Sequence, residues 1–354
     1  MFSNGNNIFI LISITYSFLI TSFFTPLTRL IGIKNKLYDI PNQRKQHYLP
    51  KVRIGGIAIF FGFILSIISF QVLNNFYLID INFLQSFSFP LIFISLFFCL
   101  GLIDDIRSLP ASFRLIIQIV LASFVWTSGI RIEELNVSWL NLDDISFTIP
   151  YLISYLITVT WIVGITNAVN WLDGLDGLAA GLSSISFLGF LAVSLYSSNY
   201  GVAIINSILL GSSLGFLKRN FFPSKIMMGD GGSYFLGSSL AILGILSATN
   251  IDGLLSLHIP LIILFLPIFD MTKVIISRII SGGSPFKPDR RHIHHNMLSF
   301  GLTEKRAVII IYGISQWFTV LCLSLLTEKK VLLISISTSL LISLYYFMNK
   351  LSKE

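Results

Sequence analysis

The sequence has few charged residues and almost no cysteine. Asp, Glu, Lys and Arg make up 12% of its 354 residues, and the two cysteines, Cys99 and Cys322, both lie inside apolar runs. They are expected to pack among apolar side chains, since they form neither a disulfide framework nor a zinc-binding spacing with histidine. Glycines with the spacing of a Walker A loop or a Rossmann fingerprint are also missing. These absences argue against a disulfide-stabilised domain, a zinc protein and the common nucleotide-binding folds.

Apolar residues, by contrast, are abundant. Hydrophobic residues account for 54% of the chain, and the mean hydropathy is +0.81. This composition excludes a soluble multidomain protein and predicts an all-α polytopic membrane protein. The apolar runs are too long and too continuous for the alternating strands of a barrel. The net charge of +7 is better explained by basic cytoplasmic loops than by nucleic acid, because no basic and aromatic pattern suggests base stacking.

Eleven apolar runs are long enough to cross a bilayer as helices. The predicted helices are near 8–33, 54–73, 86–103, 111–128, 150–166, 178–196, 201–217, 233–247, 254–280, 306–326 and 331–348. The first run has no basic segment before it and no small-residue cleavage site after it, so it is predicted to be a membrane helix rather than a signal peptide. The whole chain, 1–354, is expected to form a single integral membrane domain.

The distribution of Lys and Arg predicts the orientation. These residues gather after the first and seventh helices and between the ninth and tenth, whereas the opposite loops carry mostly acids. The positive-inside rule places the basic loops in the cytoplasm, so the N-terminus is predicted to be outside and the C-terminus inside. The longest outer loop, 129–149, is too short to fold alone and is expected to form a small strand pair or an amphipathic segment.

The most unusual stretch is Asn167-Ala-Val-Asn-Trp-Leu-Asp173-Gly-Leu-Asp176-Gly-Leu-Ala-Ala-Gly181. It places two carboxylates and two carboxamides among glycines, directly between two long apolar runs. Lipid cannot solvate such groups, so they indicate a functional site. Asp173 and Asp176 are three residues apart and would share one face of a helical turn. A solvated turn between helices is the alternative interpretation.

Two further polar clusters follow the first and third helices. The first loop contains Asp39-Ile-Pro-Asn-Gln-Arg-Lys45-Gln-His47 and then Lys51-Val-Arg53, which by themselves are also typical of a plain topology signal. Asp104 and Asp105 are adjacent at the inner end of the third helix. Neighbouring carboxylates repel each other unless a cation, a proton or Arg107 compensates, and helix capping would need only one of them.

The last two clusters lie later in the chain. Asn220 precedes Gly229-Asp230-Gly-Gly-Ser233, where a glycine-flanked Asp meets the predicted start of the eighth helix. This arrangement suits a metal ligand beside a helix N-terminus that favours phosphate. The other cluster is Arg278 followed by Pro288-Asp-Arg290-Arg-His292-Ile-His294-His295. Histidines among arginines suit phosphate at least as well as a metal, and Mg²⁺ prefers oxygen ligands.

Together the clusters place Asp, Asn, Arg, Lys and His on one membrane face. This combination fits phosphate chemistry in which carboxylates hold Mg²⁺, with Mn²⁺ as the alternative ion, cations bind a diphosphate, and the apolar body accepts a lipid. A transporter would instead carry polar residues near the bilayer midplane, and the helix centres here are plain. Asp270 in the ninth helix is the exception, and it is expected to pair with Lys273 or Arg278.

Taken in order, these motifs resemble those of the polyprenyl-phosphate N-acetylhexosamine-1-phosphate transferase family. They run from the first loop to the ninth and cover most of the chain. The predicted topology also agrees with the family's bacterial GlcNAc-1-phosphate transferase branch. The resemblance implies that an undecaprenyl-type lipid phosphate attacks the sugar-linked phosphorus of a UDP-N-acetylhexosamine at the cytoplasmic face of the bacterial plasma membrane. The products would be UMP and a lipid-diphosphate-sugar.

The resemblance also implies roles for individual residues. Asp230 resembles the principal Mg²⁺ ligand, and Asn170 is the second residue expected at the metal. The residues expected to be catalytic are Asp104, Asp105, Asp173, Asp176, His292, His294 and His295. The residues expected to bind substrate are Lys45, Arg53, Asn167, Asn170, Asn220, Arg278 and Arg290.

Several alternatives remain open. The segment 290–295 resembles the GlcNAc branch more than the branch that transfers phospho-MurNAc-pentapeptide, so UDP-GlcNAc is preferred over that donor and over UDP-QuiNAc, UDP-FucNAc and UDP-GalNAc. Direct displacement is favoured over a covalent Asp-phosphate intermediate, because a lipid phosphate, with a second pKa of about 6, is already largely dianionic. A lipid-linked-sugar transporter or a scaffold is the rival outside the enzyme class. No residue pattern decides between O-antigen, lipopolysaccharide, teichoic acid or another glycan, or names the interface of a homodimer.

Overall fold

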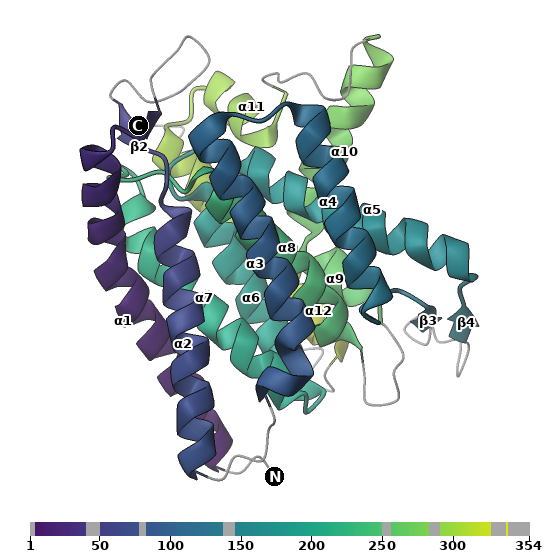
Figure 1. Cartoon of the computed structure of the whole chain (residues 1–354). Helices are drawn as coiled ribbons and strands as arrows, with labels where there is room; N and C mark the ends of the chain where they lie inside the picture. Colours follow the sequence, from purple (N-terminus) through teal and green to yellow (C-terminus); the bar gives the residue numbers. More distant parts are fainter. Residues whose placement is uncertain are drawn as a thin grey trace.

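The computed structural model describes residues 4–39, 50–77, 83–136, 146–249, 256–282, 291–326 and 338. These residues form a bundle of helices with two short strand pairs (Figure 1). The helices are α1 (Asn4–Lys34), α2 (Gly56–Tyr77), α3 (Phe83–Arg107), α4 (Ala111–Thr127), α5 (Tyr151–Leu172), α6 (Leu178–Tyr196), α7 (Tyr200–Asn220), α8 (Gly229–Ala248), α9 (His258–Ile263), α10 (Phe265–Ile280), α11 (Ile293–Ser299) and α12 (Glu304–Leu326). The strands are β1 (Tyr38–Asp39), β2 (Lys51–Val52), β3 (Glu134–Asn136) and β4 (Ser146–Thr148).

The bundle has the composition of a multi-pass membrane protein. Among the described residues, seven helices are long and apolar enough to cross a bilayer. Two shorter apolar helices, Gly56–Val72 and Ala111–Thr127, accompany them. Many large apolar side chains of α1, α3 and α5 face outward, which is expected where lipid replaces water. The predicted helix 331–348 lies outside the described residues, apart from Thr338.

The ninth predicted helix, 254–280, is wrong as a single helix. The chain breaks at Leu264, whose φ of −96° and ψ of 17° separate α9 from α10. Pro267 lies three residues later, and its ring would clash with the carbonyl of Ile263 in a continuous helix. In the observed structure Pro267 instead lies in the first turn of α10, where its missing N–H needs no helical partner.

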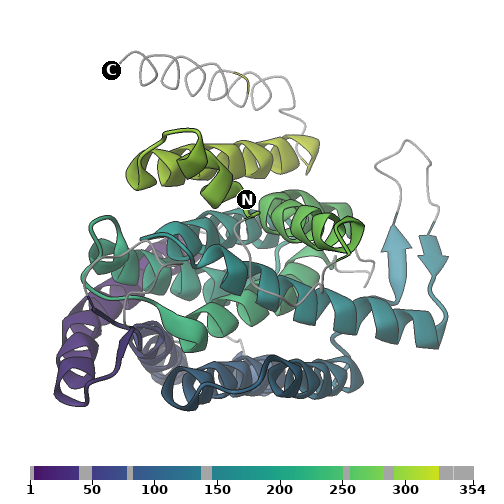
Figure 2. The same ribbon diagram turned by 90° about the horizontal axis from the view of Figure 1, so that it is seen from above.

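The centre of the bundle is α8. All of its residues except Asp230 and Leu246 are buried, and it packs against α2, α3, α5, α6, α7 and α9. Figure 2 shows α3 and α12 on opposite sides of the molecule, with the central helices between them. Because a helix surrounded by protein cannot use lipid contact for stability, close packing and satisfied polar groups must hold α8 in place.

Glycines allow the backbones around α8 to approach closely. A Cβ atom on Gly101 of α3 would lie 2.2 Å from the carbonyl oxygen of Asp230, and one on Gly56 of α2 would lie 2.2 Å from the backbone nitrogen of Gly232. Neither position can hold a larger residue without moving α8. The first turn of α8 is therefore wedged between α2 and α3.

The polar loops gather at one end of the bundle. Tyr38 pairs with Val52 and Asp39 with Lys51 in the antiparallel pair β1–β2, which lies at the same end as α11 (Figure 1). The pair β3–β4 lies beyond the far end of α5, away from α11 (Figure 1). The expectation of a small strand pair in the loop 129–149 is confirmed by β3 and β4.

The contact at Gly101 provides a test of this packing. We expect Gly101→Ala to lower the free energy of unfolding by about 1–3 kcal/mol, the usual cost of overpacking, because the new methyl group would collide with backbone atoms of α8. Thermal unfolding in detergent micelles would measure the effect. Gly164→Ala is the matched control, since its Cβ would meet only Met271 Cε at 3.5 Å. Equal unfolding temperatures for the two variants would contradict the packing described here.

Candidate functional site

The start of α8 is held by a carboxylate from α3. Asp105 accepts hydrogen bonds from the backbone N–H groups of Asp230 and Gly231, both at 2.8 Å. These N–H groups belong to the first turn of α8, where no helical carbonyl can pair with them. Asp105 therefore caps α8 from another helix, and its negative charge also faces the positive end of the helix dipole.

Asp230 is thereby fixed at the polar end of the bundle. Its Oδ2 accepts a hydrogen bond from Arg53 Nη2 at 2.5 Å, and its Oδ1 accepts one from Asn170 Nδ2 at 2.7 Å. Arg53 Nε also lies 2.9 Å from Asp105, so one guanidinium bridges both carboxylates. Asn170 Nδ2 donates to Ser233 as well. The side-chain carbonyl oxygen of Asn170 has no hydrogen-bond partner among the described residues.

Asp104 has different partners although it is adjacent to Asp105. Its carboxylate is buried and accepts hydrogen bonds from the backbone N–H of Leu109, at 2.6 Å, and from Arg114 Nη1. The same Arg114 nitrogen lies 3.8 Å from Asp230. Arg107, which the sequence offered as a compensating group, forms no ion pair among the described residues. Instead, Arg53 compensates Asp105 and Arg114 compensates Asp104.

The loop between α5 and α6 contains two carboxylates with unlike environments. Asp176 accepts hydrogen bonds from Lys51 Nζ at 2.9 and 2.8 Å, and from the N–H and the hydroxyl of Ser224 at 2.9 and 2.7 Å. It therefore joins β2 to the loop that precedes α8. The Asp173 carboxylate accepts no hydrogen bond within the described part of the chain. Desolvation, together with the nearby carboxylates of Asp230 and Asp105, raises the pKa of Asp173 well above its usual range.

These oxygen atoms suit a hard cation. The described residues contain no group of three His, Cys, Asp or Glu side chains arranged as a complete metal site. Mg²⁺, however, keeps several waters and is usually bound through one or two carboxylates and the phosphates of a substrate. Asp230, the unpaired Asp173 carboxylate and the carbonyl oxygen of Asn170 supply that kind of donor. A divalent cation would offset the desolvation of Asp173 and its repulsion by Asp230 and Asp105, so the residues present fit such an ion.

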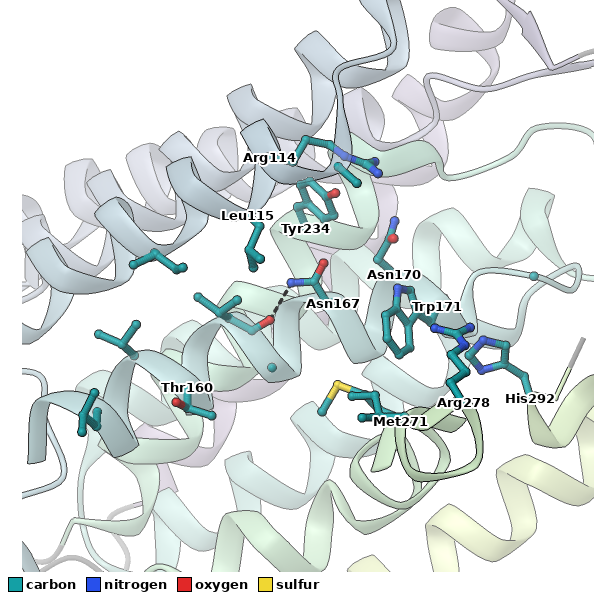
Figure 3. A pocket seen from close by; sticks show the side chains of 18 of the residues that line it. Arg114, Leu115, Thr160, Asn167, Asn170, Trp171, Tyr234, Met271, Arg278 and His292 are labelled. Atoms are coloured by element: carbon teal, nitrogen blue, oxygen red, sulfur yellow. Dashed lines mark hydrogen bonds between the residues drawn. The ribbon is translucent and has the colours of Figure 1, made fainter. Parts of the chain in front are cut away.

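A pocket of about 800 Å³ adjoins the carboxylates. Its residues come from α4, α5, the loop after α5, α8, α10, and α11 with the residue before it. Arg114 and Asn170 both line the pocket and contact Asp230. Figure 3 shows its polar end, where Asn170 and Arg278 lie with Trp171 between them. The other end is apolar and includes Ile119 and Leu156, which are exposed on the lateral surface of the bundle. The pocket therefore joins a charged end to an apolar groove.

The histidine segment closes the polar end of this pocket. Asp270 of α10 accepts a hydrogen bond from the backbone N–H of Ile293 at 2.7 Å, and its other oxygen lies 2.7 Å from His292 Nδ1. The expectation that Asp270 pairs with Lys273 or Arg278 is wrong, because its partner is His292 at the start of α11. Arg278 instead lies over the ring of Trp171, with 5.0 Å between its Cζ atom and the ring centroid.

His294 is the most enclosed of the three histidines. Its side chain is buried, and a Cβ atom on Gly174 would lie 2.6 Å from its Nε2 atom, so α11 rests directly on the loop that contains Asp173. Desolvation and the neighbouring rings of His295 and His292 lower the pKa of His294 to about 3. His294 is therefore neutral at physiological pH.

The structure gathers most of the residues that the sequence singled out, but in separate groups. The predicted residues that line the pocket are Asn167, Asn170, Arg278, His292, His294 and His295. Those in the adjoining charged cluster are Arg53, Asp104, Asp105, Asp173, Asp176 and Asp230. Asn220 is buried away from the pocket and donates to the carbonyl of Ile226 at 2.9 Å. Lys45 and Arg290 lie outside the described residues.

Sequence analysis missed several side chains of the site. Arg114 links two of the carboxylates, and Gln118 accepts a hydrogen bond from Asn167 at 2.6 Å. Both lie in α4, four residues apart, and therefore share one helix face. A charged and a polar residue at this spacing in an otherwise apolar run was the signal, and the description of the helix centres as plain was wrong for α4. Trp171 and Tyr234 also line the pocket, but nothing in the sequence separates them from packing residues.

The helices and this site define a polytopic membrane protein with a charged site at one end of the bundle. The sequence profile of glycosyl transferase family 4 matches residues 87–248. The chain is 34% identical over 311 residues to the probable undecaprenyl-phosphate N-acetylglucosaminyl 1-phosphate transferase of Bacillus subtilis (strain 168), covering 88% of this chain and 83% of that protein.

Two other relatives show similar coverage. The chain is 32% identical over 323 residues to the decaprenyl-phosphate N-acetylglucosaminephosphotransferase of Mycobacterium tuberculosis (strain ATCC 25618 / H37Rv). This match covers 83% of this chain and 77% of that protein. The chain is 30% identical over 310 residues to the undecaprenyl-phosphate alpha-N-acetylglucosaminyl 1-phosphate transferase of Salmonella typhi. This match covers 83% of this chain and 78% of that protein. The chain therefore belongs to glycosyl transferase family 4, which confirms the resemblance seen in its motifs.

The lowered pKa of His294 predicts how stability depends on pH. An unfolded histidine has a pKa of about 6.5, so unfolding takes up a proton below that pH. The folded protein should lose about 2 kcal/mol of stability between pH 7 and pH 5 from this residue alone. We expect His294→Gln to remove that part of the loss, measured by chemical unfolding in micelles at both pH values. An unchanged difference between pH 7 and pH 5 would contradict a neutral, buried His294.

Proposed function

We propose that this chain transfers N-acetylglucosamine 1-phosphate from UDP-GlcNAc to undecaprenyl phosphate, releasing UMP and forming undecaprenyl-diphosphate-GlcNAc. The relatives named above are transferases of this kind, acting on undecaprenyl or decaprenyl phosphate. The chain is a phosphotransferase that acts on a polyprenyl phosphate and a sugar donor. The observation that carries the proposal is the junction of a charged site with an apolar groove that opens on the lateral surface of the bundle.

The two ends of the pocket suit the two halves of a lipid phosphate. Ile119 and Leu156 offer an apolar, laterally open surface to a polyprenyl chain. Arg114 lies at the polar end, where its guanidinium is available to a phosphate while it contacts Asp104 and Asp230. Arginine holds phosphate through several parallel hydrogen bonds, so it can orient the attacking oxygen.

We propose Mg²⁺ as the resident ion, held by Asp230 with Asn170 and Asp173, and Mn²⁺ as its substitute. When bound, the ion neutralises charge on the diphosphate of the donor. The chain's own cations act in the same direction, because Arg53 and Arg114 both contact Asp230 and lie beside the incoming phosphates. Arg278, above the face of Trp171, supplies a further positive charge at the pocket wall.

The contacts of the adjacent pair favour direct displacement. A covalent intermediate on Asp104 or Asp105 would need one of these two carboxylates to be free to attack phosphorus. Both oxygens of Asp105 accept backbone N–H groups of α8, and both oxygens of Asp104 accept hydrogen bonds from Leu109 and Arg114. Because the lipid phosphate is itself largely dianionic, alignment and charge neutralisation are sufficient, and the lipid phosphate oxygen attacks directly.

The topology completes the proposal. Eleven membrane spans in one integral membrane domain, the ninth of them broken between α9 and α10, would put the charged end at the cytoplasmic face, with the N-terminus outside and the C-terminus in the cytoplasm. The basic loops next to that end support this orientation. UDP-sugars are then reached from the cytoplasm, and the bacterial plasma membrane supplies the lipid. A homodimer stays an expectation.

Release of UMP tests the proposed reaction. The full-length protein in micelles, with undecaprenyl phosphate and Mg²⁺, should release UMP from UDP-GlcNAc but not from UDP-GalNAc or UDP-MurNAc-pentapeptide. EDTA should stop the reaction. Asp230→Asn should lower kcat by roughly 100-fold or more, the scale of losing one electrostatic contact to the transition state.

A matched control separates loss of chemistry from loss of fold. Glu133→Gln also removes one carboxylate, but its side chain pairs with Arg131 next to β3, at the opposite end of the bundle, so kcat should stay within about 2-fold of wild type. UMP release from the pentapeptide donor alone, or full activity in Asp230→Asn, would overturn the proposal.

A further inference from the structure

His292 is held to α10 by a single buried carboxylate. Asp270 and His292 are 1% and 7% exposed, and Asp270 Oδ2 lies 2.7 Å from His292 Nδ1. The other oxygen of Asp270 accepts the backbone N–H of Ile293 at 2.7 Å. One side chain therefore caps the first turn of α11 and fixes the ring that stands at its start.

This pairing determines which ring nitrogen faces a ligand. An ionised carboxylate only accepts hydrogen bonds, so Nδ1 of His292 must carry a proton. The ring lines the pocket, and with Nδ1 engaged, Nε2 is the nitrogen that remains for a bound molecule. Figure 3 shows His292 beside Arg278 at the polar end of the pocket. The ring also packs edge-on against Trp171, with 5.7 Å between the ring centroids, which restricts its rotation.

Among the described residues, the groups around His292 are cationic or neutral apart from Asp270. The charged and titratable groups that face it are Asp270 and Arg278 from α10 and His294 and His295 from α11. Trp171 from α5 is uncharged. Arg291 points elsewhere, since its Nη1 donates to the carbonyl and hydroxyl of Ser277. An anion that enters the pocket therefore meets the positive charge of Arg278 beside the His292 ring.

We infer that Asp270 is a positioning residue for the reaction: it accepts a hydrogen bond from Nδ1–H of His292 and thereby lets the ring carry a proton on each nitrogen when the sugar-donor diphosphate binds, so that a positively charged Nε2–H group donates to a diphosphate oxygen. This inference rests on the proposed function. Asp270 itself touches no substrate. His292 transfers no proton; it takes one with the bound anion and stabilises the negative charge that develops on the departing UMP.

Asp270→Asn isolates this role. The carboxamide can still accept from the N–H of Ile293, but its NH₂ group then faces Nδ1. The ring must carry its single proton on Nε2, and it can no longer take a second one, because two N–H groups would oppose each other. We expect kcat to fall on the order of 100-fold, with KM changed less than about 3-fold. Ser277→Ala, which removes another contact between α10 and the start of α11, should leave both constants unchanged.

A double-substitution cycle distinguishes positioning from plain stabilisation. His292→Gln keeps the contact between Asp270 and Ile293 but removes the ring. If Asp270 acts through His292, adding Asp270→Asn to His292→Gln should lower kcat no further. An equal 100-fold loss in both backgrounds would overturn the inference, as would full kcat in Asp270→Asn while the wild type releases UMP. In the latter case the proposed function would stand.

A spectroscopic readout is independent of activity. ¹⁵N NMR of histidine-labelled wild-type protein, assigned with His292→Gln, should show the His292 proton on Nδ1, and Asp270→Asn should move it to Nε2. A wild-type ring with its proton on Nε2 would refute the inference even if Asp270→Asn failed to fold. If the wild type released no UMP from any donor, the proposed function would fail, and with it the role in catalysis.

Discussion

The site depends on the contact between the Asp105 carboxylate and the first turn of α8. Two backbone N–H groups that would otherwise remain unpaired at the polar end of a buried helix are satisfied by one side chain. One of these N–H groups belongs to Asp230, so the same contact also fixes the position of Asp230. With α8 wedged between the backbones of α2 and α3 at Gly56 and Gly101, Asp230 has little freedom to move. A rigid acidic residue is what a metal–phosphate site requires.

The charges of the site fall into two kinds. Some carboxylates are anchors with every oxygen engaged, as Asp176 is by Lys51 and Ser224, and Asp270 by His292 and Ile293. Asp173 is different, since it has no partner among the described residues and its pKa is raised. Anchors hold the loops together without substrate. Asp230 shares its two oxygens between Arg53 and Asn170, and the unpaired carboxylate of Asp173 would gain most from a cation. The segregation explains why six acidic residues can share one end of a membrane protein, namely Asp104, Asp105, Asp173, Asp176, Asp230 and Asp270.

Much of the fold was predictable, because the length of an apolar run sets whether a helix can cross a bilayer. The break at Leu264 was missed even though Pro267 marks it, since the run is apolar on both sides. The polar clusters were also predictable, because ionisable residues beside membrane helices are costly unless they serve a function. The role of each acidic residue could not be predicted. Asp105 and its partner Asp230 are 125 residues apart, and the adjacent residues Asp104 and Asp105 look alike in sequence. Only the packing of α3, α4 and α8 distinguishes them.

We expect α8, capped by Asp105, to present Asp230 as the ligand of a divalent ion. The most direct measurement is Mn²⁺ binding by electron paramagnetic resonance, with the full-length protein in micelles and UDP present. We expect one bound Mn²⁺ in the wild type. Asp230→Asn should weaken Mn²⁺ binding strongly at an unchanged unfolding temperature, whereas Glu133→Gln should retain it. Wild-type affinity for Mn²⁺ in a folded Asp230→Asn protein would contradict the account, because the ion would then be held by other residues.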